Sequence, residues 1–122
     1  MTILDPAAVV QAQLDAYNAK DIEALMLTYA PDARQFVLHG ALLAEGIDAI
    51  RPRYMARFAE PDLHARLLSR TVLGNFVTDL EVMTRNFPEG RGMVEMQCMY
   101  EVVDGRIQTA SFATGATTLI TS

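Results

Sequence analysis

The spacing of apolar residues changes near the middle of this 122-residue chain. In the first half, apolar positions recur every three or four residues, which is typical of amphipathic helices. Asp5 and Pro6 offer an N-cap carboxylate followed by proline at the first helical position, so we predict a helix from there to about Ala19. Asp21 begins a second helix in the same way, which we expect to end at Pro31-Asp32.

Residues 33–40, ARQFVLHG, are predicted to form a strand, and residues 41–46 a short connection to a third helix. The apolar stripe of that helix includes Tyr54. Pro52 is awkward inside it, because proline removes one backbone hydrogen bond and clashes with the preceding turn. We therefore expect the helix to begin late, near Asp48, or to kink.

The second half contains four runs rich in β-branched and aromatic residues, which predict strands. The runs are residues 64–73, 76–87, 93–103 and 106–118. Asp104-Gly105 lies between the last two and is typical of a two-residue hairpin turn. Helices followed by an antiparallel meander predict the α+β class, in a single domain covering residues 1–122.

The predicted strand 93–103 has two different faces. One face is almost entirely apolar, and we expect it to pack against the helices; it consists of Val94, Met96, Cys98, Tyr100 and Val102. The other face is mixed, and Met99 and Val103 on it suggest partial burial. A homodimer through the outer face of the sheet would supply that burial; a scatter of exposed methyl groups is the alternative.

Composition and charge narrow the range of partners. The formal net charge is −5 and no run of Lys or Arg forms a basic patch, which argues against nucleic acid as a partner. We find neither a basic amphipathic helix nor an apolar stretch of about 20 residues, so no membrane contact is expected. The single Cys98 excludes an internal disulfide. Without the pattern of a secretory signal, we expect a cytoplasmic protein.

Three segments resemble members of the nuclear transport factor 2-like superfamily. They are AYNAKDIEALMLTYAPDA (16–33), LLAEGIDAIRPRYMARF (42–58) and VVDGRIQTASF (102–112), and the likeness to the SnoaL-like and ketosteroid-isomerase-like group runs from about residue 8 to residue 115. The resemblance implies a cone-shaped, curved antiparallel sheet packed over three N-terminal helices, as in a cystatin-like roll. It also implies a pocket inside the cone for a small apolar ligand, but it does not specify the reaction.

The resemblance allows the three groups of the ketosteroid isomerase reaction to be sought here. Val37 falls where the isomerase has its aspartate base, and Gln13 where it has a tyrosine. Gln97 or Cys98 falls where the isomerase has a protonated aspartic acid. The isomerase carboxylates are therefore missing, and we do not expect the steroid Δ-isomerase mechanism as such. Tyr17, one helical turn after Gln13, and Gln97 remain candidate hydrogen-bond donors.

His39 is the best single candidate for a catalytic base. If the strand continues to residue 40, His39 points to the same side as Val37, and the unperturbed pKa of histidine, about 6.5, suits proton transfer at neutral pH. The alternative is a partly exposed residue that ends the strand. A metal site built from His39, His64 and Asp79 is a poor match to ligand spacing, so we expect neither a metal nor a cofactor.

Further expectations concern individual side chains. From fold analogy alone, the walls of the pocket include Val37, Tyr54, Met55, Cys98, Met99 and Phe112. We expect Arg70 and Asp79 to pair across the sheet, and Glu81 and Glu95 to lie on a solvated face. Tyr29 is assigned to the buried stripe of the second helix.

Three functions remain open from the sequence. The first is a pocket protein that carries out metal-free acid–base chemistry of the isomerase or lyase type on a small apolar molecule. The second is a non-catalytic domain that binds a hydrophobic ligand. The third is a module whose role is dimerisation. The sequence does not decide whether the chain is an enzyme.

Overall fold

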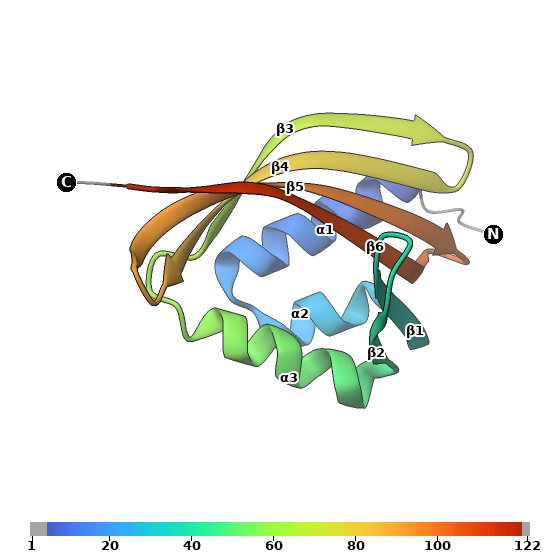
Figure 1. Ribbon diagram of the computed structural model, residues 1–122. Coiled ribbons are helices and arrows are strands. Elements are labelled where there is room, and N and C mark those ends of the chain that lie inside the picture. Colours follow the sequence, from blue (N-terminus) through green and yellow to red (C-terminus); the bar gives the residue numbers. More distant parts are fainter. Residues whose placement is uncertain (1–4, 121–122) are drawn as a thin grey trace.

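The computed structural model describes residues 5–120, which form a curved sheet folded over three helices (Figure 1). The helices are α1 (Pro6–Ala19), α2 (Ile22–Leu27) and α3 (Ile47–Phe58). The strands are β1 (Tyr29–Val37), β2 (Leu42–Glu45), β3 (His64–Leu73), β4 (Phe76–Phe87), β5 (Gly90–Val103) and β6 (Arg106–Leu119).

The first two helices begin where their aspartate caps predict. The Asp5 carboxylate accepts a hydrogen bond from the Ala7 backbone N–H (3.1 Å), and the Asp21 carboxylate accepts one from Ala24 (3.1 Å). The predicted end of the second helix at Pro31 is wrong. α2 stops at Leu27, because the backbone after it pairs with β6 and already belongs to β1.

The region around α3 differs from the prediction in two ways. Residues 41–46, expected to be a connection, contain β2, which pairs antiparallel with β1. α3 begins at Ile47, directly after Gly46, whose φ of 82° suits glycine. Pro52 lies inside the helix as its sixth residue, near the start, where its missing N–H removes a single hydrogen bond.

The six described strands form one sheet in the order β2-β1-β6-β5-β4-β3. The long strands β3 to β6 form the predicted antiparallel meander, whereas β1 runs parallel to β6. The sheet is therefore mixed. The crossover places β1 and β2 at one end of the curved sheet, where α3 packs against them (Figure 1), so that β1, α3 and β4 can all contribute to one cavity.

The core lies between the helices and the concave face of the sheet. The predicted apolar face of β5 is confirmed: Val94, Cys98, Tyr100 and Val102 are buried. On its opposite face, Met99 stays partly exposed. No helix among residues 5–120 is long and apolar enough to cross a membrane.

Candidate functional site

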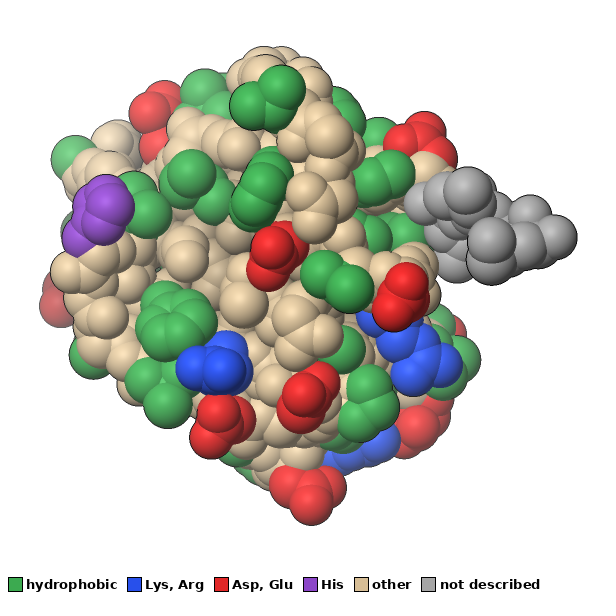
Figure 2. Space-filling view, turned by 90° about the vertical axis from the view of Figure 1, so that its right-hand side faces the viewer, with side chains coloured by type: hydrophobic (Ala, Val, Ile, Leu, Met, Phe, Trp, Pro, Cys, Tyr) green, Lys and Arg blue, Asp and Glu red, His purple; other side chains and the backbone are tan. Residues whose placement is uncertain are grey.

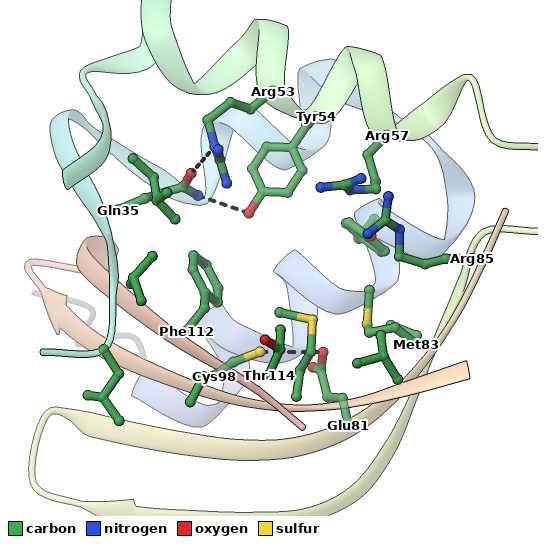
Figure 3. Close-up of a pocket in the computed structure, with 18 of the residues that line it drawn as sticks. Gln35, Arg53, Tyr54, Arg57, Glu81, Met83, Arg85, Cys98, Phe112 and Thr114 are labelled. Atoms are coloured by element: carbon green, nitrogen blue, oxygen red, sulfur yellow. Dashed lines mark hydrogen bonds between the residues drawn. The ribbon is translucent and has the colours of Figure 1, made fainter. Parts of the chain in front are cut away.

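A cavity of roughly 640 Å³ lies between α3 and the concave face of β4, β5 and β6 (Figure 3). Much of its wall is apolar and comes from the sheet, and includes Met83, Val94, Met96 and Phe112. A few polar groups interrupt this wall, from β1, α3 and β4. A concave apolar site with a small number of polar groups is the usual form of a small-molecule site.

Glu81 is the acidic side chain on the cavity wall. Residues of β4 alternate between the two faces of the sheet, and Val77, Asp79, Glu81 and Met83 share the buried concave face. Glu81 is only 4% exposed, so the expectation that it lies on a solvated face is wrong. Glu95 is exposed, as expected.

Asp79 and Glu81 have different partners, although they lie two residues apart on the same face. Asp79 forms the predicted pair with Arg70, whose Nε and Nη2 donate to the carboxylate at 2.7 and 2.9 Å. Glu81 takes part in no ion pair within residues 5–120; the Cys98 thiol, 3.7 Å away, donates to its Oε1. The cavity thus contains a carboxyl group without a cationic partner.

Burial raises the pKa of Glu81 to about 7. The nearby Asp79 carboxylate raises it as well, while the Cys98 thiol and the more distant Arg70 act in the opposite direction. Near neutral pH this carboxyl group is therefore present in both protonation states. A group with that property can both accept and donate a proton.

Gln35, Arg53 and Tyr54 lie on the opposite side of the cavity from Glu81 (Figure 3), and they form a hydrogen-bonded cluster that also includes the buried Tyr29. The Arg53 Nε donates to the Gln35 side-chain oxygen (3.1 Å), which leaves the Gln35 amide N–H to donate to Tyr54 (3.0 Å). The Tyr29 and Tyr54 hydroxyl oxygens are 2.6 Å apart. Burial raises the pKa of both tyrosines, so both stay protonated at neutral pH.

Arg57 and Arg85 form a third polar group on the cavity wall, and both bind Glu60. Arg85 donates to both carboxylate oxygens of Glu60 (3.2 and 2.8 Å), and Arg57 donates to one of them (3.2 Å). Desolvation would raise the pKa of Glu60, but the hydrogen bonds from Arg85, the Asn86 backbone and Arg57 outweigh it and lower the pKa to about 2. Glu60 is thus ionised at neutral pH and holds both guanidinium groups.

Five of the site residues predicted from the sequence lie on the cavity wall: Tyr17, Val37, Tyr54, Cys98 and Phe112. Gln13, at the position of the isomerase tyrosine, lines it too. Burial raises the pKa of Tyr17. Unlike Tyr54, Tyr17 makes no side-chain hydrogen bond within the described part of the chain.

Four predicted residues lie outside the cavity. β1 ends at Val37, so the alternation does not reach His39, which occupies an exposed turn with φ of 56°. Gln97 and Met99 are on the outer face of β5. Met55 follows Tyr54 on α3 but points away from the cavity and is 49% exposed.

The metal arrangement considered for His39, His64 and Asp79 does not form. Both histidines are exposed, and the Asp79 carboxylate binds Arg70. Across residues 5–120, no group of three His, Cys, Asp or Glu side chains is placed to hold a metal ion.

The sequence-based selection missed seven polar residues of the cavity wall, namely Gln35, Arg53, Arg57, Glu81, Arg85, Thr114 and Thr117. A signal existed for one of them: Gln35 is two residues before Val37 and shares its side of the strand. The arginines carried no such signal, because charged residues on helices and strands usually face water.

Comparison with protein families gives a match to the SnoaL-like domain over residues 10–110. The chain belongs to the SnoaL-like family. The match covers all three segments on which the resemblance was based, except for the last two residues of 102–112. No curated protein matches this SnoaL-like chain significantly.

Solved structures share the SnoaL-like chain's fold. An uncharacterised cystatin-fold protein from Novosphingobium aromaticivorans has a TM-score of 0.83 at 22% identity, with 90% of this chain and 98% of that one covered. A suggested polyketide cyclase from Sinorhizobium meliloti has a TM-score of 0.74 at 26% identity (90% and 100% covered). A hypothetical protein with a ketosteroid isomerase-like fold from Catenulispora acidiphila, solved with trimethylamine, has a TM-score of 0.75 at 18% identity (86% and 83% covered).

Proposed function

We propose that this SnoaL-like protein binds a small, largely apolar carbonyl compound in the cavity and moves a proton on it with the Glu81 carboxyl group. The observation that carries the proposal is the position of Glu81, which is buried on the cavity wall and, within residues 5–120, is hydrogen-bonded through its side chain only to the Cys98 thiol. A buried carboxyl group without a cation is costly for folding, and such groups are concentrated at functional sites.

The proposed step is proton abstraction next to the carbonyl. The Glu81 carboxylate takes a proton from the carbon, and the C–H electron pair moves to form an enolate whose charge resides on the carbonyl oxygen. Return of the proton to another carbon gives an isomer, and loss of a leaving group from the neighbouring carbon gives an elimination product. A pKa of about 7 suits both halves of this exchange at neutral pH.

Tyr54 is the proposed donor to the enolate oxygen. Gln35 donates to the Tyr54 oxygen, and Tyr29 lies within hydrogen-bond distance of the same oxygen. When Tyr29 donates as well, the Tyr54 proton is left free for a ligand in the cavity. Donors that are already oriented stabilise a developing oxyanion without reorganisation.

The structural neighbour described as a suggested polyketide cyclase supports a substrate with carbonyl groups, because cyclisation of such compounds starts from an enolate. It supports the class of reaction and names no substrate for this chain.

Passive binding of an apolar ligand is the second candidate. It is favoured by Val37, which aligns with the isomerase base, and by Cys98, one of the two residues (with Gln97) that align with its protonated acid; Val37 and Cys98 both line the cavity. In that case Glu81 would take no part in turnover. The predicted homodimer through the outer face stays a prediction.

Hydrogen–deuterium exchange separates the two candidates. We would follow exchange of the acidic methylene of 2-tetralone, and of a panel of related aryl ketones, by proton NMR in D₂O. Glu81→Gln is compared with Glu95→Gln, which makes the same change at an exposed site on β5. His39→Ala serves as a second control, because His39 lies outside the cavity.

We expect wild-type protein to accelerate exchange and Glu81→Gln to reduce that acceleration about 100-fold or more, with both controls unchanged. Thermal stabilisation by the ketones without accelerated exchange would support passive binding and overturn the catalytic proposal. An exchange rate that survives in Glu81→Gln would also overturn it.

A further inference from the structure

The charge of the cavity wall is opposite to that of the chain. The formal net charge of the protein is −5, yet the charged residues on the wall, among residues 5–120, are three arginines and one acid: Arg53, Arg57, Arg85 and Glu81. On the face drawn in Figure 2, by contrast, Lys and Arg side chains lie among acidic ones. The concentration of arginine in the cavity therefore needs its own explanation.

Arg57 and Arg85 are only partly neutralised. They share one carboxylate, that of Glu60, so the three groups together keep one positive charge. Arg53 adds a second positive charge on the same side of the cavity and binds the neutral Gln35. The side chains of Arg57 and Arg85 remain 37% and 23% exposed, and Figure 3 shows both directed towards the cavity.

The arginines have N–H groups to spare. A guanidinium has five N–H donors in a rigid fork. Towards Glu60, Arg85 uses its Nε and Nη2, and Arg57 uses its Nη1. Because Glu60 fixes their positions, the remaining donors are oriented before any ligand arrives, and a planar carboxylate is the group that such donors bind best.

We propose that the ligand of this cavity is an organic anion: an apolar body that carries a carboxylate, which Arg57 and Arg85 bind. This inference rests on the proposed function, because it takes the cavity to be a ligand site. It adds the class of ligand and the orientation of the bound ligand in the cavity.

The positions of Glu81 and Arg85 on β4 fix the orientation of the ligand. The two side chains share a face of the strand four residues apart, roughly 13 Å along it, and Met83 lies between them on the apolar wall. The anionic group is attracted to Arg85 and repelled by ionised Glu81. The ligand therefore places its carboxylate at the arginines, its apolar part across Met83 and its reacting carbon at Glu81.

Two fluorescent probes of nearly equal shape test the proposal. 8-Anilinonaphthalene-1-sulfonate is anionic, and N-phenyl-1-naphthylamine is its neutral counterpart. The dissociation constants of both are measured for wild type, Arg57→Met/Arg85→Met and Arg66→Met. Arg66 is an exposed arginine of β3 outside the cavity, so its variant controls for the loss of a positive charge away from the cavity.

Removing both arginines leaves Glu60 without its cations, which is itself destabilising. The same comparison is therefore repeated in a Glu60→Gln background. Glu60→Gln is also measured alone. This variant keeps both arginines and removes the carboxylate that neutralises them, so it tests the proposal without deleting any guanidinium.

We expect Arg57→Met/Arg85→Met to weaken binding of the anionic probe about tenfold or more and binding of the neutral probe less than about twofold. Glu60→Gln should strengthen the anionic probe, and Arg66→Met should leave both unchanged. Equal effects on the two probes, or none on the anionic one, would overturn this inference and leave proton transfer by Glu81 standing. Failure of both probes to bind the wild type would likewise overturn this inference, and the ketone exchange experiment would still decide proton transfer by Glu81.

Discussion

The Cys98 thiol lies 3.7 Å from the Glu81 carboxyl oxygen, and both side chains are buried. The two residues come from the neighbouring strands β5 and β4, so the antiparallel register of the sheet holds them together. Cys98 lies at one of the two positions to which the protonated acid of ketosteroid isomerase aligns. Glu81, on the neighbouring strand, places a buried carboxyl group beside that position, and the Cys98 thiol donates a hydrogen bond to it.

The first prediction follows from that contact. The thiol stabilises the ionised form of Glu81, so its removal in Cys98→Ala should raise the pKa of Glu81 further above its usual range. Cys98→Ser provides a stronger donor of similar size and should lower it. The titration of the Glu81 side-chain carbon by NMR measures both changes, and a shift in the same direction for both variants would contradict this account.

The second prediction concerns stability and pH. The pKa of Glu81 is about 7 in the folded protein against a usual 4.5, so the folded state binds the extra proton. Stability from this group is fully present below about pH 4.5 and is lost as the pH rises towards 7. The difference between the two pKa values corresponds to about 3 kcal/mol.

Glu81→Gln should abolish this loss, and the variant should be more stable than wild type by up to about 3 kcal/mol at mildly alkaline pH. Urea denaturation at several pH values checks this, with Glu95→Gln as the exposed control. If the difference in the free energy of unfolding between wild type and Glu81→Gln does not change with pH, the prediction is wrong.

Glu60 should give a pH dependence of the opposite sign. Its pKa is lowered to about 2, despite desolvation, by the hydrogen bonds from Arg85, Asn86 and Arg57. The stability it contributes is present above about pH 4.5 and is lost as the pH falls towards 2, by about 3 kcal/mol at most. Acid unfolding of Glu60→Gln should therefore be less steep than that of wild type below about pH 4.5. Parallel curves for the two proteins would contradict the prediction.

Much of the fold was predictable because local rules decided it. Asp5 and Asp21 cap helices where the sequence places them, and Asp104-Gly105 forms the last hairpin turn. What could not be predicted depended on pairing between distant segments. Tyr29 is in a strand rather than in α2 because β6 pairs with it, and Ile107, its partner, is 78 residues away in sequence (107 − 29).

The candidate site was harder to predict for the same reason. Whether His39 faces the cavity depended on where β1 ends. The strand ends at Val37 and the turn begins at the next residue, so His39 lies in the turn. Whether Glu81 faces water or the cavity depended on which face of β4 meets the helices. The alternation of side chains along β4 was visible in the sequence. Because one face of the strand mixes Asp, Glu and Val, however, the pattern did not reveal which face meets the helices.

Two of the tyrosines on the cavity wall, Tyr17 and Tyr54, should respond differently to loss of their hydroxyl groups. Tyr54→Phe removes the acceptor of the Gln35 amide and the partner of Tyr29, so it should cost about 1–3 kcal/mol and slow ketone exchange as well. Tyr17 makes no side-chain hydrogen bond within residues 5–120, so Tyr17→Phe should change stability by less than about 0.5 kcal/mol. Thermal and urea denaturation measure both values; equal costs would contradict the assigned network.

The last prediction concerns the predicted homodimer through the outer face of the sheet. Large apolar side chains are partly exposed there, among them Leu73, Phe76 and Met99, and the last of these is 39% exposed. A lysine in place of Met99 would have to be desolvated in such a dimer, so Met99→Lys should weaken association by about 2 kcal/mol or more.

Met55→Lys makes the same substitution on α3, where Met55 is 49% exposed, and should leave association unchanged. Sedimentation velocity over a range of concentrations distinguishes the two variants. Because the cavity lies on the opposite, concave face, the monomeric Met99→Lys variant should still bind the neutral fluorescent probe. A dimer that persists in Met99→Lys would place the interface elsewhere. A wild type that is monomeric at every concentration would show that the apolar side chains of the outer face are exposed to solvent.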